Sequence, residues 1–233
     1  MIRIFEEQAL QEGITIISDK VHYLNNVMRS KVGDDLIIVN GKDGEFLGTI
    51  QKITKKEVEI LINKKTKEYK KDRFLGLIFS PIHKIDLLIK NAIELGITDL
   101  IPFKAQYKQE KFKFDKVKAN VIEAIEQCER TDFPNIENEN TLENILSKIE
   151  NENGIVFFCE ERSMKTINLK NYAFNSNTKY YILVGCEGGF ADDEKRLIKS
   201  FSCVKSISLG KHILRAENAT SAGVSIVKYL MEN

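Results

Sequence analysis

Two short stretches near the C-terminus of this 233-residue chain hold the side chains that could perform chemistry. In the first, the apolar run 180–184 ends in a glycine-rich turn, 185–190, and acidic residues then open a helical pattern. A buried strand that feeds a tight glycine turn is a common way to bring backbone N–H groups against a ligand. The second stretch, 209–215, combines apolar side chains with a glycine and ends in Arg215. Together they predict a binding site that also holds a cation.

The spacing of the glycines narrows the class of ligand. The turn is neither a GxGxxG fingerprint nor a GxxxxGK[ST] phosphate loop, so NAD and ATP are poorly supported. Leu209, Ile213 and Leu214 beside glycines suit a flat, partly apolar ligand such as an adenosine. A third loop, 159–162, follows another expected strand, and the carboxyl ends of parallel strands share one edge of a sheet. We therefore expect the three loops to form one site.

Composition indicates a soluble globular protein, with 42% hydrophobic and 30% charged residues. No apolar run approaches the roughly 20 residues of a membrane span. Two acids stand where a signal peptide would place its apolar core, so we expect a cytoplasmic protein. The four cysteines form no CxxC pair and there are only three histidines, so neither a disulfide framework nor a metal site is indicated.

The net charge of +1 is uninformative, but two segments are locally basic. Segments 63–73 and 104–118 each carry six basic residues against two acidic ones, and the second interleaves them with Tyr107, Phe112 and Phe114. Lysines with aromatic residues can pair with phosphates and stack on bases. A solvated linker and a solvated loop explain the two segments equally well.

The periodicity of apolar residues changes near residue 72. Short strand patterns surround a hairpin signal at 40–44 and a small helix that begins near Ser18, which suggests a compact β-barrel over residues 1–72, with 63–72 as a linker. Residues 73–233 alternate between buried strand patterns and amphipathic helices, which predicts an α/β domain with a parallel sheet.

The last expected helix, 216–231, has an apolar stripe that is unusually rich in small residues. The stripe consists of Ala219, Ala222, Gly223, Ile226, Val227 and Leu230. Small residues permit a second backbone to approach closely. Packing within one chain and a subunit interface are both open interpretations.

The motifs GCEGGF and SLGKHILRAENAT resemble the GPEGGF and LG-x-RILR-x-ETA motifs of the 16S ribosomal RNA (uracil-N3) methyltransferases, the RsmE family. That family belongs to the SPOUT, or α/β-knot, superfamily. The resemblance covers nearly the whole chain, because HYLNNVMRSKVGDDLIIVNGKDGEFLGTI, KIDLLIKNAIELGITDLIPF and EAIEQCER resemble further segments of the family.

The resemblance implies an architecture and an activity. Residues 1–72 would form a PUA-like β-barrel that binds RNA, and 73–233 a trefoil-knotted SPOUT domain that binds S-adenosyl-L-methionine. The protein would be a homodimer associated through the knot, with no metal and no membrane contact. Its product would be N3-methyluridine in the 16S ribosomal RNA of the small subunit. Alternatives are a knotted methyltransferase with another RNA target, and a non-catalytic RNA-binding or ribosome-assembly factor.

The resemblance also assigns roles to single residues. Uracil N3 must lose a proton during methylation, so a cation near O2 or O4 and a base would help. Arg215 is the expected cation and Glu217 the expected base or orienter of Arg215, although both could simply cap a helix. The expected RNA contacts are Arg3, Arg29, Lys31 and Arg130; the last could equally be a buried structural arginine. The expected cofactor-binding residues are Glu160, Val184, Gly185, Glu187, Gly188, Gly189, Leu209, Gly210, Ile213 and Leu214. Glu187 is ambiguous, since it could instead pair with backbone or with Arg215.

The chain departs from the family pattern at several positions. Cys186 replaces a proline in the glycine turn, and Ala191 replaces a serine that would cap the next helix, a role that Asp192 could assume. Three further departures are Asn91 for lysine, His212 for arginine and Asn218 for threonine. His212 could act as a base or phosphate ligand, or be a plain surface substitution.

Overall fold

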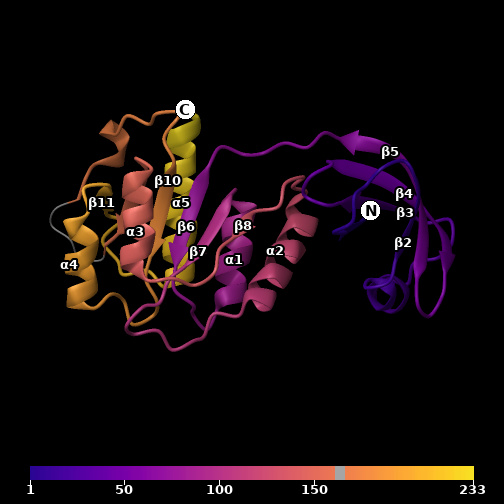
Figure 1. The fold of residues 1–233 in the computed structure, drawn as a ribbon, viewed down its shortest axis with the longest axis horizontal. Helices are drawn as coiled ribbons and strands as arrows, with labels where there is room; N and C mark the ends of the chain where they lie inside the picture. The colour runs from indigo at the N-terminus through magenta and orange to yellow at the C-terminus, as the bar shows by residue number, and fades with distance from the viewer. Residues whose placement is uncertain (161–165) are drawn as a thin grey trace. The chain divides into compact units, whose positions relative to one another are not determined.

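The computed structural model describes residues 1–160 and 166–233. Glu161 and Arg162 of the expected third loop therefore lie outside the described residues. The chain forms two compact units. The N-terminal unit comprises Met1–Asp72 and Ile125–Phe133, and the C-terminal unit comprises Arg73–Ala124 and Pro134–Asn233. Figure 1 follows the chain through both by colour.

The N-terminal unit is built on a five-stranded sheet in the order β1-β3-β4-β5-β2. Strands β1 and β3 run parallel and the other neighbours are antiparallel. Alternating aliphatic residues on these strands form a closed core in which Ile4, Ile38 and Ile60 are fully buried. The strands are β1 (Ile2–Phe5), β2 (Gly13–Ile17), β3 (Asp35–Val39), β4 (Glu45–Ile53) and β5 (Val58–Lys67).

Two expectations for the first unit are wrong in detail. Strand β5 continues to Lys67, so the segment expected as a linker begins inside the sheet. The small helix is a π-helix at Tyr23–Val27, in which the Met28 N–H donates to the Tyr23 carbonyl oxygen at 2.9 Å. Its N-cap residue is His22, not the expected Ser18. The wider turn breaks the 3.6-residue spacing. Leu24 is therefore buried, whereas the expected core residues Val27 and Met28 are exposed.

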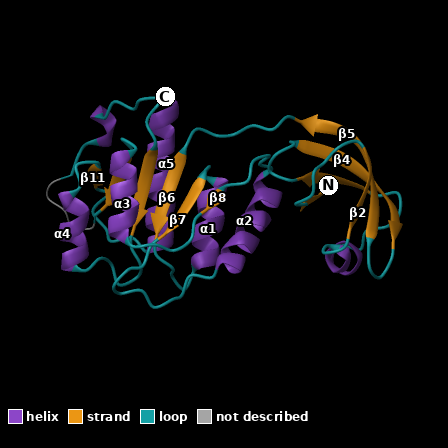
Figure 2. Ribbon diagram, in the orientation of Figure 1, coloured by secondary structure: helices purple, strands orange, loops and turns teal. Residues whose placement is uncertain are grey.

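The C-terminal unit contains a six-stranded parallel sheet in the order β11-β9-β10-β6-β7-β8. This confirms the predicted α/β class, and Figure 2 shows the strands with their helices. The strands are β6 (Leu75–Phe79), β7 (Asp99–Pro102), β8 (Asn135–Ile136), β9 (Ile155–Cys159), β10 (Tyr180–Val184) and β11 (Val204–Ile207). The helices are α1 (Ile85–Glu94), α2 (Phe114–Cys128), α3 (Leu142–Asn151), a 3₁₀ turn (Leu169–Asn171), α4 (Asp192–Ser200) and α5 (Ala216–Glu232).

Strand β10 shows how helices cover both faces of this sheet. Neighbouring residues on a strand point to opposite faces. Tyr181 lies against Gly154 and the end of α3, whereas Ile182 lies against Gly223 of α5. Both faces of β10 are consequently buried along its whole length, as its continuous apolar sequence predicted. Among the described residues, no helix is long and apolar enough to cross a membrane.

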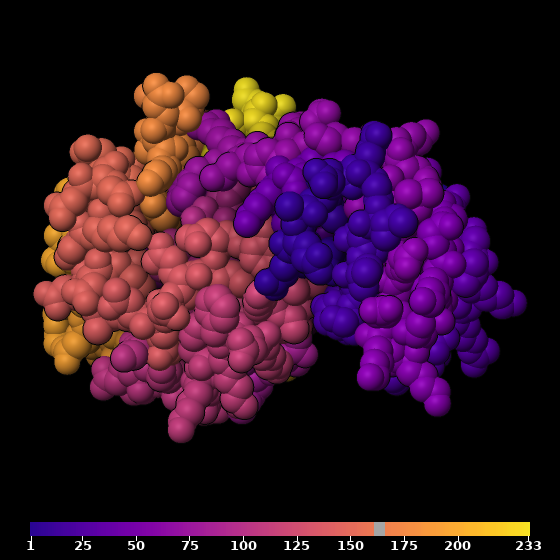
Figure 3. All heavy atoms as spheres, turned by 45° about the vertical axis from the view of Figure 1, so that its right-hand side comes forward, coloured from indigo at the N-terminus to yellow at the C-terminus, as the bar shows by residue number. Residues whose placement is uncertain are grey.

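The small-residue face of α5 divides into two parts. Ala219, Gly223 and Val227 are buried within the unit, and a Cβ on Gly223 would lie 3.2 Å from the Cys159 sulfur and 3.3 Å from Ile182. Ile226 and Tyr229 are instead 39% and 66% exposed. The end of α5 lies at the molecular surface (Figure 3). Packing within the chain therefore explains Gly223. Only the exposed residues of this face could belong to a subunit interface.

Replacing Gly223 by leucine should destabilise the C-terminal unit by about 1–3 kcal/mol, because the new side chain overpacks the space beside Cys159 and Ile182. Urea unfolding would measure the change. Ser225, an exposed residue two positions along the same helix, offers the matched control. Ser225→Leu should change the free energy of unfolding by less than about 0.5 kcal/mol. Equal stability of the two variants would contradict the assigned packing.

Candidate active site

A pocket of about 1090 Å³ lies at the carboxyl ends of β6, β9, β10 and β11 in the C-terminal unit. Every residue expected from the sequence to bind the cofactor or to act in catalysis lines it. The end of β9 contributes Cys159 and the described part of the loop after it contributes Glu160, whereas the loops after β10 and β11 each contribute a continuous run of residues. The topology thus brings together segments that are far apart in sequence, as the parallel sheet requires.

The glycine turn after β10 is closed by a hydrogen bond of 2.9 Å from the Gly189 N–H to the Cys186 carbonyl oxygen. Gly189 has φ 68°, which favours glycine. Side chains would not fit at two other positions. A Cβ on Gly185 would lie 2.7 Å from the Phe190 ring, and one on Gly188 would lie 2.8 Å from the Tyr107 Cβ. The turn therefore needs glycine for close approach as well as for backbone conformation.

The loop after β11 supplies an apolar wall. Leu209 and Leu214 are partly exposed, and Ile213 is more than half exposed. Phe190 and Phe158 also line the pocket, and their rings meet edge to face with centroids 5.0 Å apart. These surfaces can cover the faces of a planar ligand, while nearby backbone groups donate and accept hydrogen bonds.

Each carboxylate in the pocket has a partner. Glu187 accepts a hydrogen bond of 2.9 Å from the backbone N–H of His83, so the backbone-pairing alternative applies to it. A Glu160 oxygen lies 2.5 Å from the Lys199 nitrogen. Glu217, only 4% exposed, has an oxygen 3.7 Å from the Lys84 nitrogen.

Arg215 differs from these residues. It is the N-cap residue of α5 but its exposed side chain makes no capping hydrogen bond, so the alternative interpretation as a capping residue does not apply to it. No described carboxylate forms an ion pair with Arg215, and Lys84 takes the place beside Glu217. The expectation that Glu217 orients Arg215 is therefore wrong in this structure. The reason is that the first turn of α5 directs Glu217 inward, whereas Arg215, the N-cap residue before that turn, is exposed to solvent.

His83, Lys84 and Lys195 line the pocket but were missed in the sequence. His83 and Lys84 lie in the loop between β6 and α1, which has no glycine motif to mark it. The available signal was topological, since β6 is a parallel strand and must end at the same edge as its neighbours. Applying that rule to every strand would have included this loop.

The departures from the family pattern have local explanations. The Ala191 N–H donates to the Glu194 side chain at 2.9 Å, which supplies one half of a capping box. Asp192 is the first residue of α4 and does not assume the cap, so that expectation is wrong. Asn91 donates at 3.1 Å to Ser221, joining α1 to α5. His212 lines the pocket and is exposed. Asn218, on α5, is also exposed.

The cysteines and acids give no sign of nucleophilic or metal chemistry. Burial raises the pKa of the Cys159 thiol to about 12, and it also raises the pKa of Cys186. Both thiols thus stay protonated near neutral pH and are poor nucleophiles. In the part of the chain that the structure describes, no group of three or more His, Cys, Asp or Glu side chains could hold a metal ion.

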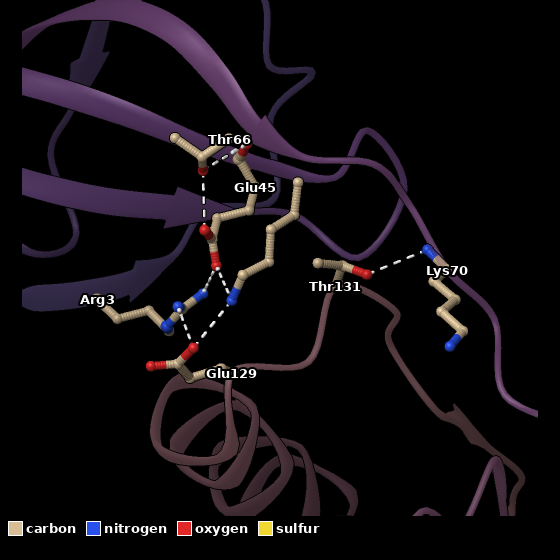
Figure 4. Close-up of polar contacts among 7 residues, drawn as sticks. Arg3, Glu45, Thr66, Lys70, Glu129 and Thr131 are labelled. Atoms are coloured by element: carbon tan, nitrogen blue, oxygen red, sulfur yellow. Dashed lines mark hydrogen bonds and ion pairs between the residues drawn. The ribbon is translucent and has the colours of Figure 1, made fainter.

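Arg3, an expected RNA contact, has a side chain that is largely buried in the N-terminal unit. Its side chain is 9% exposed, and its guanidinium lies 2.6 Å from Glu45 and 3.4 Å from Glu129 (Figure 4). Burial alone would raise the pKa of Glu45, but hydrogen bonds from Thr66, Lys67 and Arg3 hold it below its ordinary value. Arg3 therefore has a structural role, and its expected contact with RNA is contradicted.

The other three expected RNA contacts differ in exposure. The Arg130 side chain is only 10% exposed and bonds Asp132 through two nitrogens, at 3.0 and 2.6 Å, so the structural alternative applies. Arg29 is exposed and has φ 55°, which turns the chain sharply before Ser30. Lys31 is also exposed, and its backbone N–H donates to Asp34 at 2.8 Å. Arg29 and Lys31 are thus accessible to a partner.

The arrangement of Lys84 and Glu217 predicts energetic coupling. Lys84→Ala should lower the free energy of unfolding by about 1 kcal/mol, because Glu217 stays buried without its cation. The same change should have little effect in a Glu217→Gln background, giving a coupling energy on the order of 1 kcal/mol. Lys195→Ala is a matched control, since Lys195 also lines the pocket but faces the exposed Asp192 at 3.8 Å. Additive effects in the urea double-mutant cycle would rule out the pair.

Comparison with known proteins agrees with this architecture. Residues 67–228 match the family model of an RNA methyltransferase domain, and residues 16–63 match that of an RNA methyltransferase PUA domain. The chain is 37% identical to ribosomal RNA small subunit methyltransferase E of Rickettsia conorii, over 98% of this chain and 95% of the relative. It is 31% identical to the protein of the same name from Buchnera aphidicola subsp. Schizaphis graminum, over 97% and 95%.

Solved structures share the fold at lower sequence identity. Ribosomal RNA small subunit methyltransferase E from Neisseria gonorrhoeae, bound to S-adenosyl methionine, superposes with a TM-score of 0.88 at 20% identity, covering 99% of this chain and 98% of that one. A Legionella pneumophila structure in complex with the cofactor SAM gives 0.86 at 22% identity, covering 98% and 97%. Because a family model matches most of the sequence and a relative is 37% identical over nearly its full length, the chain belongs to the ribosomal RNA small subunit methyltransferase E family.

Proposed function

We propose that the protein transfers a methyl group from S-adenosyl-L-methionine to N3 of a specific uridine in 16S ribosomal RNA. The observation that carries the proposal is the convergence of the glycine turn, the apolar wall and Arg215 on one pocket. The curated relatives are named for methylation of small-subunit ribosomal RNA, and the Neisseria gonorrhoeae structure holds S-adenosyl methionine. Such an enzyme would act in the cytoplasm on the small subunit or its precursor RNA.

The pocket fits this cofactor in size and in the placement of its glycines. Its volume of about 1090 Å³ is ample for one cofactor and part of a nucleotide. Gly189 and Gly210 line it, and a Cβ on either would meet no protein atom within 4 Å. Such Cβ atoms would occupy space that a ligand close to the backbone needs. When bound, S-adenosyl-L-methionine supplies an electrophilic sulfonium methyl group.

Each wall of the pocket has a proposed role. Leu209, Ile213 and Leu214, with Gly210, enclose the adenine. Val184, Gly185, Gly188 and Gly189 hold the amino-acid portion, and Glu187 fixes the turn through His83. Glu160, paired with Lys199, borders the same space.

Arg215 and Glu217 are proposed to act on the uracil. Methylation at N3 leaves negative charge on the ring during proton loss, mainly on O2 and O4. Arg215 is exposed at the pocket and free to approach these oxygens. Glu217 is the proposed proton acceptor, and the Lys84 nitrogen lies 3.7 Å from its carboxylate.

The exposed cations of the N-terminal unit are the proposed RNA contacts outside the pocket. Arg29 and Lys31 occupy one short turn, within the segment that matches the RNA methyltransferase PUA domain. Two cations on a turn of defined backbone can contact successive phosphates.

Loss of the protein should remove N3-methyluridine from 16S ribosomal RNA. Mass spectrometry of nucleosides, with mapping of the position, would detect this in a strain that lacks the protein. The wild-type chain should restore the mark and Arg215→Ala should not, because removing one charge-stabilising group lowers rates by about 10²–10³-fold. Calorimetry should show that Arg215→Ala still binds S-adenosylhomocysteine. An unchanged nucleoside profile, together with no binding of S-adenosylhomocysteine by the wild-type protein, would favour a non-catalytic RNA-binding factor.

We also propose that the protein forms a homodimer through α5. The exposed Ile226 and Tyr229, with the partly exposed Ala222 and Leu230, form an apolar face on α5. Large exposed apolar side chains grouped on one face are typical of interaction surfaces.

The double substitution Ile226→Lys and Tyr229→Lys should therefore give monomers, because each lysine would bury a charge at the interface. Sedimentation velocity would report the mass. Val32→Lys replaces an apolar residue of the N-terminal unit that is 63% exposed, and it should leave the dimer intact. A double variant that sediments like the wild type would exclude this face.

A further inference from the structure

The segment between β7 and α2 is the second basic and aromatic segment of the sequence, and the proposed function gives it no role. We name residues 104–113 the lysine loop. It carries four lysines together with Tyr107 and Phe112. As a solvated loop it would need no contact with the active site.

The lysine loop is instead fixed against the glycine turn. A Cβ added to Gly188 would lie only 2.8 Å from the Tyr107 Cβ. The two residues therefore pack so closely that position 188 has room only for glycine. The Gln106 N–H donates at 2.9 Å to Glu194, at the start of α4. These contacts place Tyr107 directly against Gly188, which lines the pocket.

A second connection runs through His83. Its Nδ1 lies 2.5 Å from the Glu110 carboxylate of the lysine loop. Its backbone N–H donates to Glu187 of the glycine turn at 2.9 Å. The loop is therefore anchored on both sides of Tyr107, by groups that also shape the pocket.

The exposed groups of the loop have one chemical character. Tyr107 is 49% exposed although its Cβ is packed, so its ring is accessible. Lys108 is engaged with Glu139 at 2.6 Å. Lys104, Lys111 and Lys113 are exposed, and none forms an ion pair with a carboxylate in the described ranges 1–160 and 166–233.

We propose that the lysine loop binds a single-stranded stretch of the substrate RNA, with Tyr107 stacking on a base next to the target uridine. Lys104, Lys111 and Lys113 contact the phosphates of the same stretch. Aromatic rings beside free cations are the usual combination for single strands, because every base has a face that can stack. The inference rests on the proposed function, since it assigns the pocket to the target base. Tyr107 is a positioning residue and takes no part in proton transfer.

Two variants distinguish the stacking role of the Tyr107 ring from the packing of its side chain on Gly188. Tyr107→Leu keeps an apolar side chain over Gly188 but removes the aromatic ring, whereas Tyr107→Phe keeps the ring. With small subunits from a strain lacking the protein as substrate, Tyr107→Leu should raise the KM for RNA about tenfold or more. It should leave kcat and the affinity for S-adenosylhomocysteine within about twofold of wild type, since stacking outside the reacting base acts mainly on binding. Tyr107→Phe should retain the wild-type KM.

The salt dependence of RNA binding distinguishes the contribution of the three lysines from that of Tyr107. For binding to a 12-residue oligouridylate, changing Lys104, Lys111 and Lys113 to glutamine should reduce the slope of log K against log salt by about two. Tyr107→Leu should weaken binding without changing the slope. Lys170→Gln is a matched control, because Lys170 is exposed on the 3₁₀ turn and lies outside the pocket.

Three results would overturn the proposal. They are a wild-type KM for Tyr107→Leu, a tenfold higher KM for Tyr107→Phe, and an unchanged salt slope for the triple lysine variant. If the wild-type protein does not methylate small subunits, the proposed function fails. The oligouridylate measurements then decide the RNA-binding role of the loop on their own.

Discussion

The close approach of backbone to aromatic rings beneath the glycine turn is the constraint on which the active site depends. Phe190 packs beside Phe103 with ring centroids 5.8 Å apart, and edge to face with Phe158. This cluster lies under the turn, so the chain leaving β10 has no room for a side chain at two of its positions. Gly185 meets that requirement against the Phe190 ring, and Gly188 meets it against Tyr107. Overpacking at either position would displace backbone, because interiors this dense cannot absorb an extra carbon.

The charges around the pocket follow from the same geometry. The three acids that line it, Glu160, Glu187 and Glu217, are each paired with a cation or with a backbone N–H. Arg215 has no such partner among the described residues, as the role proposed for it requires. A preorganised cation that need not first break an ion pair is the more effective stabiliser of a developing anion. The fold thus places three paired acids and the unpaired Arg215 in a single pocket.

The sequence predicted those parts of the fold and site that rest on local patterns. Continuous apolar runs marked the buried strands such as β10, and paired motifs marked the two loops that border the pocket. Lys84 and His83 were missed because their importance arises only when β6 ends beside β10, a pairing encoded by residues about 100 positions apart. Arg3 was misjudged for a similar reason. A sequence shows that an arginine is charged, but its partner Glu45 lies 42 positions away and becomes its neighbour only in the folded sheet.

Burial decides which cations of the N-terminal unit can reach a phosphate. Arg3 and Arg130 are held by carboxylates in places where solvent is nearly excluded. Moving either onto a phosphate would leave Glu45 or Asp132 buried without its partner, and losing one member of a buried pair costs about 3–5 kcal/mol. A single phosphate contact in water returns less than that. Affinity for RNA must therefore come from cations that are already exposed, such as Arg29 and Lys31, and the same reasoning selects Lys104, Lys111 and Lys113 over Lys108 in the C-terminal unit.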